Sequence, residues 1–353
     1  MNHNYLLVFI PITLLLDGFE ADSTLVFMSS GIAIVPLAGL LGKATESLSI
    51  FIGETLGGLL AATMGNAPEL IISLFALKAG LYDVVKAAIT GSIVGNLLLG
   101  LGLAVFIGGL DKDKLKFNQT SVGMSSGLLM LASVGLIVPA VFQFITQQAT
   151  DFSMEIAVVL FVAYILSLVF TLKTHQHLFM TEALQSADEA EGGQVEENLW
   201  SKKMAIWVLV AVTIGITFMS EALTGAIEPA AESFGFTPIF AGVIFLATFG
   251  NVTDMMNSVR FARNNQMDLS MGISVGASTQ VVMFVAPVLI FASYFLGPKP
   301  LDLLFVPFEV VAIVIAVLIN RSLTVDGESH WMEGVMLLGV YLILAIGFFF
   351  LPM

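Results

Sequence analysis

Two short stretches of the sequence each combine a carboxylate with an asparagine inside an otherwise apolar run. Residues 65–69 read Gly-Asn-Ala-Pro-Glu, and residues 250–254 read Gly-Asn-Val-Thr-Asp. A carboxylate at membrane depth costs at least about 2.5 kcal/mol, so an acid in such a run is a candidate for function. Carboxylate and amide oxygens are also the ligands that hard cations such as Ca²⁺ accept. Glu69 and Asp254 are therefore the first candidates for binding a cation or a proton.

The two stretches are copies of one internal repeat. A constant offset of 185 residues aligns them and pairs Glu69 with Asp254. The residues that are identical at this offset are Ala62 and Ala247, Thr63 and Thr248, Gly65 and Gly250, Asn66 and Asn251, Ser73 and Ser258, Asp83 and Asp268, and Gly91 and Gly276. A repeat centred on a membrane acid indicates a single site to which both halves contribute.

Each motif is expected to interrupt its helix. Pro68 removes a backbone donor and Gly65 weakens the helix, so the first span should kink or unwind there. Carbonyls freed in this way are tolerated where they line a watered cavity, and they would add hard oxygen ligands. In the second copy Thr253 replaces the proline, so we expect a gentler break after Gly250.

Two acids that face one cavity suggest how it could exchange ions. Both carboxylates cannot remain ionised without a cation, because burial and mutual repulsion favour the protonated forms. Metal and protons would then compete for the same oxygens. Such competition is a mechanism for exchange that needs no separate proton path.

The other polar residues of the motifs have two interpretations each. Asn66 and Asn251 are candidate ligands, and each could also cap a broken helix. Thr63 and Thr248 are expected mainly to satisfy local carbonyls and so to shape the site.

The helices that follow the motifs carry small and polar faces. Their glycines are expected to allow close helix packing, and the set is Gly91, Gly95, Gly272 and Gly276. The polar residues Ser92, Asn96 and Gln280 are candidates to line the cavity. Asp83 and Asp268 precede these helices and are most simply N-caps.

The composition excludes a soluble domain. Of the 353 residues, 57% are hydrophobic and only 11% are charged, whereas soluble domains carry about 25% charged residues. Much of the net charge of −14 lies in loops, and no nucleic-acid partner is expected. The chain has no cysteine, so it has neither disulfides nor thiolate metal sites.

Eleven apolar runs are long enough to cross about 30 Å of hydrocarbon. They lie at about 4–20, 24–42, 51–79, 84–110, 121–146, 152–173, 203–223, 237–264, 268–297, 301–320 and 332–352. The fold class expected is therefore an all-α integral membrane protein with about 11 transmembrane helices. One long polar connection, residues 174–202, contains the acids Glu182, Asp188, Glu189, Glu191, Glu196 and Glu197. It is a solvated linker or a regulatory segment, and the sequence leaves this open.

The connection divides the chain into two halves of five spans. The expected organisation is an extra N-terminal helix in 1–23, a first five-helix repeat in 24–173, the acidic segment in 174–202 and a second repeat in 203–353. Basic residues favour a cytoplasmic N-terminus and acidic segment. Because five is odd, the second repeat enters the membrane inverted, which is typical of secondary transporters.

Several motifs resemble those of a known family. The run PLAGLLGKATESLSIFIGETLGGLLAATMGNAPELIISLFALKAG, then GSIVGNLLLGLG, FNQT at 117–120 and MDLSMGISVGASTQ, resemble the calcium/proton antiporters (cation/proton exchangers) of the Ca²⁺/cation antiporter superfamily. The resemblance covers nearly the whole chain. It implies an eleven-span fold with inverted five-helix repeats, an acidic cytoplasmic helix between them and proton-driven export of Ca²⁺. It also implies that Glu69 and Asp254 are the essential carboxylates, with Gln280 a polar residue near the site.

The chain departs from the family pattern at the second acid. The family normally carries Glu where Asp254 stands and a polar or His-containing stretch after it, whereas Met255 and Met256 follow here. The shorter acid leaves the choice between Ca²⁺, Mn²⁺ and another divalent cation open. The four residues before the first apolar run favour a prokaryotic cell (inner) membrane over a vacuolar one.

Three alternatives compete with Ca²⁺/H⁺ antiport. Sodium-coupled Ca²⁺ exchange belongs to the same superfamily, but GSIVGN and GASTQ look like the proton-coupled type. An intramembrane aspartyl protease needs a Gly-x-Gly-Asp turn, and the nearest string, Gly100-Leu101-Gly102, continues with leucine. A channel suits the paired inverted breaks less well than alternating access does. We therefore expect a transporter and no enzyme, with Ca²⁺, H⁺ and the lipid bilayer as partners, no resident cofactor, and an open question about homo-oligomers.

Overall fold

The protein is almost entirely helical in the computed structural model, which describes residues 4–146, 152–175 and 199–352. The first half contains α1 (Phe9–Gly18), α2 (Ser23–Ile52), α3 (Glu54–Met64), α4 (Ala67–Lys78), α5 (Tyr82–Val94), α6 (Leu101–Gly109), α7 (Gln119–Thr146) and α8 (Ser153–Val169). The second half contains α10 (Lys202–Phe234), α11 (Pro238–Phe240), α12 (Ala247–Arg263), α13 (Met267–Gln280), α14 (Ala286–Leu296), α15 (Pro307–Leu323) and α16 (Trp331–Phe349). Two short strands, β1 (Leu115–Lys116) and β2 (Glu328–Ser329), pair antiparallel. The prediction of an all-α fold is confirmed.

Several helices join into longer rods through π-helical turns. These turns are Gly95–Gly100 between α5 and α6, Phe170–Thr174 after α8, Ala241–Leu246 before α12, and Val281–Val285 between α13 and α14. A short 3₁₀ segment, Asn4–Val8, precedes α1. π-Helical turns are rare and occur frequently at functional sites.

Eight helices in the described part of the chain are long and apolar enough to cross a membrane. The bent pair α3–α4 would add a ninth. The ten residues of α1 span only about 15 Å, and α15 has 17 residues. The expected number of eleven spans is therefore not confirmed.

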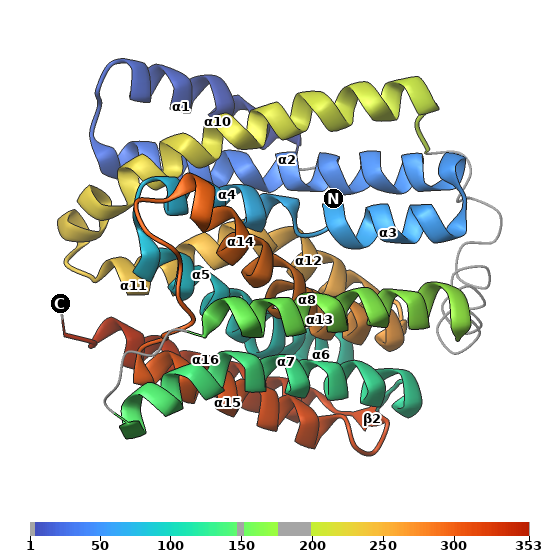
Figure 1. Cartoon of the computed structure of the whole chain (residues 1–353). Helices are drawn as coiled ribbons and strands as arrows, with labels where there is room; N and C mark the ends of the chain where they lie inside the picture. Colours follow the sequence, from blue (N-terminus) through green and yellow to red (C-terminus); the bar gives the residue numbers. More distant parts are fainter. Residues whose placement is uncertain (1–3, 147–151, 176–198, 353) are drawn as a thin grey trace.

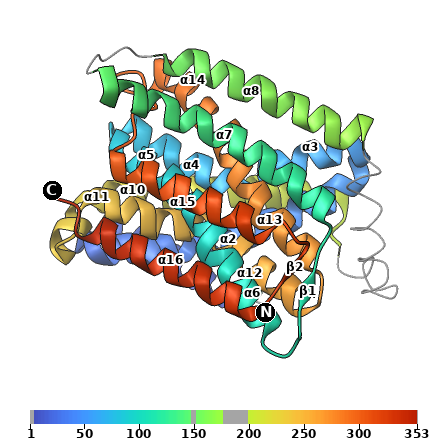
Figure 2. The ribbon, with the colours of Figure 1, turned by 90° about the horizontal axis from the view of Figure 1, so that it is seen from below.

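The helices lie side by side and run in similar directions across the view of Figure 1. Two long helices, α2 and α10, pack against each other on one side of the bundle, and α1 lies beside them. On the opposite side lie α7, α15 and α16, which are nearest the reader in Figure 2. The two helices on the first side begin the two expected repeats, so homologous elements meet there.

The distribution of polarity is that of a protein in lipid. Large apolar side chains such as Phe144, Trp207 and Ile343 are exposed on the outer helices. Asn66, Glu69, Ser92, Asn96 and Asn251 are buried inside. A bundle with an apolar exterior and a polar centre fits a bilayer, in which only satisfied helices can span.

Asp83 and Asp268 do not cap their helices, so the N-cap prediction was wrong. Neither α5 nor α13 has a side-chain hydrogen bond at its N-cap. Asp83 instead lies 3.4 Å from the Nζ atom of Lys86. Asp268 accepts a hydrogen bond from the backbone N–H of Asn118, in the segment after α6. Asp83 therefore pairs within α5, and only Asp268 joins two elements.

Candidate cation and proton site

The first motif lies at a break between two helices, as the sequence predicts. α3 ends at Met64, α4 begins at Ala67, and the two axes differ by 47°. Pro68 stands in the first turn of α4, where a missing N–H costs nothing. Glu69 also lies in this first turn, where the helix dipole favours negative charge. Proline and glycine here begin a new helix instead of kinking an old one.

Glu69 is buried, and no hydrogen-bond donor among the described residues stabilises its carboxylate. Its exposed fraction is 7%, and neither carboxylate oxygen has a hydrogen-bond partner in the described part of the chain. The carboxylate of Asp254 is the charged group whose field acts on it. A buried carboxylate without donors is very costly when ionised, so it requires a proton or a cation.

The second motif is not broken. α12 runs continuously from Ala247 to Arg263 through Gly250 and Asp254. The backbone irregularity lies upstream of the motif, in the π-helical turn Ala241–Leu246. The expectation of a gentler break at this motif was therefore wrong, because Thr253 retains the N–H that a helix interior needs. As a result, Asp254 lies in mid-helix and is partly exposed.

The two motifs touch through a glycine. A Cβ atom at Gly250 would lie 3.0 Å from Cγ of Glu69 and 3.4 Å from its Oε1. The matching position, Gly65, would meet only the carbonyl of Ala61, in its own half. Gly250 therefore gives the Glu69 side chain its space, and the contact has no counterpart in the first motif.

The amides connect the halves in a crossed pattern. The Nδ2 of Asn66 donates to Oε1 of Gln280 and, at 3.4 Å, to the carbonyl of Ala62. The side chain of Asn66 makes no capping hydrogen bond to α4. The structure therefore does not support the interpretation of Asn66 as a helix cap.

Asn251 forms the second part of this crossed pattern. Its Nδ2 donates to Oγ of Ser92 at 2.9 Å and to the carbonyl of Ala247 at 2.8 Å. Its Oδ1 accepts from Nδ2 of Asn96 at 2.9 Å. Each asparagine thus bonds the helix that follows the other motif. Five of the predicted polar residues are thereby joined into two inter-half networks.

The threonines and some of the glycines act as expected. Oγ1 of Thr63 donates to the carbonyl of Leu59 at 2.8 Å, and Oγ1 of Thr248 donates to that of Ile244. Gly91 packs tightly, since a Cβ there would lie 2.7 Å from Cβ of Ala247.

Two glycines of the second half contradict the packing prediction. A Cβ atom at Gly272 or at Gly276 would meet no atom within 4 Å. The small-residue face of α13 is therefore not packed in this structure.

A narrow cavity lies beside Glu69. Its lining comes from both halves and consists of Glu69, Ile72, Ser73, Ala88, Ile89, Ser92, Leu246, Ala247, Val281 and Val285. The cavity volume between these side chains is about 10 Å³. That is about the room one water needs. The cavity suits a single small ion or water and no organic substrate.

Some functional features were not predicted. Met255 is buried and approaches both glycines that bound a π-helical turn, because a Cβ at Gly95 would lie 3.2 Å from its Cε and one at Gly100 2.9 Å from its Cγ. The turns Gly95–Gly100 and Val281–Val285 follow the two motifs at nearly equal offsets. In the sequence, the first π-helical turn is marked by a glycine at each end, Gly95 and Gly100. The second turn, Val281–Val285, contains no glycine that could have indicated it.

The described residues contain no group of three or more His, Cys, Asp or Glu side chains that could hold a metal. Any cation bound here would therefore need neutral oxygens besides the two carboxylates. The acids of the long connection, Glu182 to Glu197, lie outside the described residues.

Comparison with known proteins agrees with this geometry. The family described as "Sodium/calcium exchanger protein" matches residues 22–173 and 204–350. The chain is 42% identical to the Ca(2+)/H(+) antiporter of Synechocystis sp., over 98% of this chain and 96% of that protein. It is 41% identical to the Ca(2+)/H(+) antiporter ChaA of Bacillus subtilis, over 97% of each.

A solved structure shows the same fold. The structure of native YfkE superposes with a TM-score of 0.84 at 37% identity and covers 99% of this chain and 100% of that one. Fold and site together define an integral membrane exchanger. The chain belongs to the sodium/calcium exchanger family, and the resemblance to the calcium/proton antiporters within it is confirmed.

Proposed function

We propose that this protein is a secondary antiporter that exchanges Ca²⁺ for H⁺ by alternating access across a prokaryotic cell membrane. The observation that carries the proposal is the buried Glu69 carboxylate, whose oxygens lack donors and which lines a cavity between the two halves. Asp254 is not among the residues that line this cavity, but the field of its carboxylate acts on Glu69. The relatives named as Ca²⁺/H⁺ antiporters support the choice of ions.

The exchange follows from competition for the carboxylate oxygens. With no metal present, Glu69 and Asp254 hold protons, because two bare charges in this space would repel each other. When the protons leave to the side of lower proton concentration, the carboxylates take up Ca²⁺. Transport then requires only that the loaded site opens alternately to each side.

Neutral groups complete the site in this proposal. The carbonyl of Met64 cannot bond the residue four positions further on, because Pro68 has no N–H. Such a carbonyl and the amide oxygens are hard ligands suited to Ca²⁺. Asn66, Asn251, Gln280, Asn96 and Ser92 join the halves by the hydrogen bonds described above. These hydrogen bonds fix the position of the two motifs, and so of their carboxylates, relative to each other.

The inverted repeats supply the alternation. We place them at 24–173 and 203–353, with the N-terminus and the acidic segment 174–202 in the cytoplasm. No resident cofactor is required by this mechanism, since the ions are the substrates. The relatives are transporters and not enzymes, which removes the intramembrane protease from consideration.

Proteoliposomes test the proposal directly. Purified protein in sodium-free buffer under an imposed pH gradient should take up Ca²⁺ while an internal dye reports proton efflux. The Glu69→Gln variant should do neither. Uptake that appears only after sodium is loaded inside would assign the protein to sodium-coupled exchange, and the absence of any cation flux would refute transport. Competition by Mn²⁺ at saturating Ca²⁺ would then settle the preferred ion.

A further inference from the structure

A second buried carboxylate lies outside the cavity and has no role in the exchange just described. Glu309 stands in the first turn of α15 with an exposed fraction of 2%. Its Oε2 accepts from the backbone N–H of Val306 at 3.0 Å, and its Oε1 accepts from Oγ1 of Thr90 at 3.2 Å. Thr90 belongs to α5 of the first half. The carboxylate therefore joins the two halves of the molecule.

Glu309 is not an ordinary helix cap. Glu333 occupies the same position in α16, where its Oε2 accepts from the backbone N–H of His330 and from Oγ of Ser329. Glu333 is half-exposed, as a solvated cap should be. No Lys, Arg or His nitrogen in the described chain lies within 4 Å of Glu309. A buried carboxylate held only by neutral donors readily changes its protonation state.

The charged groups near Glu309 form a path from the surface. The fields of two charged groups on α5 reach it, that of the cation Lys86 and that of the anion Asp83. The Nζ of Lys86 lies 3.1 Å from Asp302 and 3.4 Å from Asp83. The exposed fractions of these side chains fall from 71% for Asp83 through 28% for Asp302 to 11% for Lys86. In the described chain, α7, α16 and the turn Gly95–Gly100 also pack on α15 but bring no charge whose field reaches Glu309.

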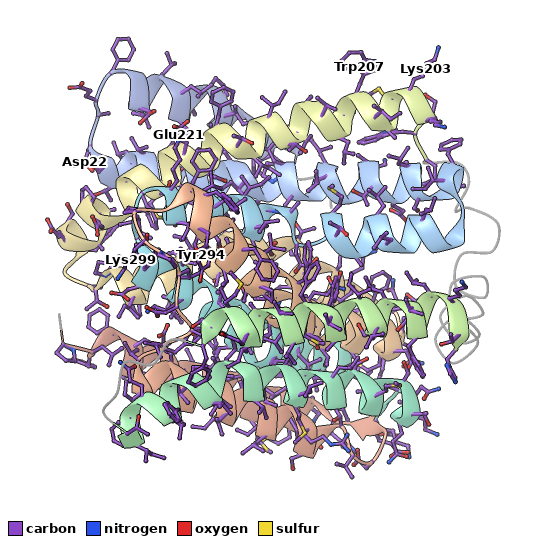
Figure 3. All side chains as sticks on the ribbon, viewed as in Figure 1. Asp22, Lys203, Trp207, Glu221, Tyr294 and Lys299 are labelled. Atoms are coloured by element: carbon purple, nitrogen blue, oxygen red, sulfur yellow. The ribbon has the colours of Figure 1, made fainter. Side chains whose placement is uncertain are left out.

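The cluster lies at one end of the bundle. Tyr82, one turn before Lys86, accepts from the backbone N–H of Lys299 and donates to its carbonyl, both at 2.7 Å. Figure 3 shows Lys299 at the end of the bundle opposite Lys203, which follows the acidic segment. The path therefore reaches the solution on the far side from that segment.

We propose that Glu309 is a second proton-binding site of the antiporter, through which the pH on the side opposite the acidic segment adjusts the α5–α15 junction. A proton from that solution converts the carboxylate to the acid. The acid then donates a hydrogen bond to Oγ1 of Thr90, and the threonine hydroxyl turns to a helix carbonyl, as threonines in helices do. Because Ala88, Ile89 and Ser92 of α5 line the Glu69 cavity, the change reaches one cavity wall.

The inference rests on the proposed function and is tested by the pH profile of transport. Ca²⁺ uptake by proteoliposomes is measured at saturating Ca²⁺ and a fixed pH difference, while both pH values are moved together. Glu309→Gln is a neutral isostere that accepts from the Val306 N–H and donates to Oγ1 of Thr90, as the protonated acid would. It should lose one inflection of the wild-type profile and keep the pH dependence that Glu69 and Asp254 impose. Glu333→Gln removes a similar cap acid and should keep the wild-type profile.

A second variant covers failure of the first to fold. Lys86→Gln removes the nearby cation, so the midpoint of the profile should move up by about one pH unit. A Glu309→Gln profile equal to that of the wild type in a protein with normal thermal stability, or an unmoved midpoint in Lys86→Gln, would overturn the inference. Loss of stability without a change of profile would reduce Glu309 to a structural cap. Absence of Ca²⁺-coupled proton movement in the wild type would instead refute the proposed function.

Discussion

The two copies of the Gly-Asn-x-x-acid motif lie in different backbones. The first copy separates α3 from α4, and its acid stands in a first helical turn. The second copy lies within the unbroken α12, with Asp254 in mid-helix. The residue before the acid differs, proline at 68 and threonine at 253, and only the second fits a helix interior. One residue can therefore decide whether a repeated motif is a break or a helix.

The difference assigns unequal roles to the acids. Glu69 is buried, lacks donors and touches Gly250 of the other half. Asp254 is partly exposed and is one methylene shorter. We infer that Glu69 is the fixed ligand of the cavity and that Asp254 is the acid reached first by solvent. Each of the following predictions compares a position of one copy with its counterpart in the other.

The largest effect is expected from neutralising Glu69. Glu69→Gln should lower Ca²⁺-coupled proton flux by more than about 100-fold. The loss of a direct ligand should exceed the 10–100-fold effect of changing a residue that only orients a ligand. Asp254→Asn should do the same while thermal stability in detergent remains near that of the wild type. Changing the side-chain length of each acid tests their unequal roles more directly. Glu69→Asp should impair transport more than Asp254→Glu, because shortening Glu69 withdraws the buried carboxylate from the cavity that it lines, whereas Asp254 is partly exposed. The reverse order would contradict the unequal roles.

The next effect concerns the backbone. Thr253→Pro places the proline of the first copy into α12 and should destabilise the protein by about 3 kcal/mol or more. Pro68→Thr should change stability by less than about 1 kcal/mol, because this proline sits in a first turn. Thermal unfolding in detergent measures both. Equal losses would mean that the two motifs do not differ in conformation as described.

A smaller effect is expected at the glycines. Gly250→Ala places a methyl group 3.0 Å from Cγ of Glu69, and displacing that carboxylate should raise the Ca²⁺ concentration for half-maximal transport roughly tenfold. Gly65 has helical backbone angles and would meet only its own half. Gly65→Ala should therefore stay within about twofold of the wild type. A matching rise in Gly65→Ala would show that the contact with Glu69 is not the cause.

The sequence predicts what composition and chemistry dictate locally. The helical fold, the offset of 185 residues, the acids and the break at Pro68 all follow from hydrophobic runs, identities and the missing proline N–H. The crossed hydrogen bonds of Asn66 with Gln280 and of Asn251 with Ser92 could not be predicted. They depend on how the halves pack, which a single sequence does not specify.

Other features depend on tertiary contacts in the same way. Asp268 bonds a loop instead of its own helix, although its local sequence favours a cap. The count of eleven spans is not confirmed because α1 and α15 are shorter than the helices that are clearly long enough to cross a membrane. The carboxylate of Glu309 lies in an apolar run with no motif around it, and only the fold shows that it meets Thr90.

The last prediction concerns Gly91 and Gly276, which are equivalent in the repeat. Gly91 is packed against Ala247 of the other half, whereas Gly276 faces open space. The position that corresponds to Ala247 at the same offset is Ala62, and small residues, Gly57 and Gly58, lie one turn before it. If the halves exchange conformations during alternating access, Gly276 should close on this small-residue face in the opposite state while Gly91 opens.

The Gly276→Ala variant tests whether the packing at Gly91 and Gly276 changes during transport or stays as it is in this structure. In the present state a methyl group at this position meets nothing, so the variant should be as stable as the wild type or up to about 1 kcal/mol more stable. The exchange rate should nevertheless fall a few-fold, because the added methyl group obstructs close packing in the opposite state, while Ca²⁺ affinity measured at equilibrium changes little. Gly272→Ala on the same open face should behave in the same way. An unchanged rate in both variants would mean that this face of α13 stays open throughout the transport cycle. The difference in packing between Gly91 and Gly276 would then be a permanent feature of the fold and would not reverse between the two states.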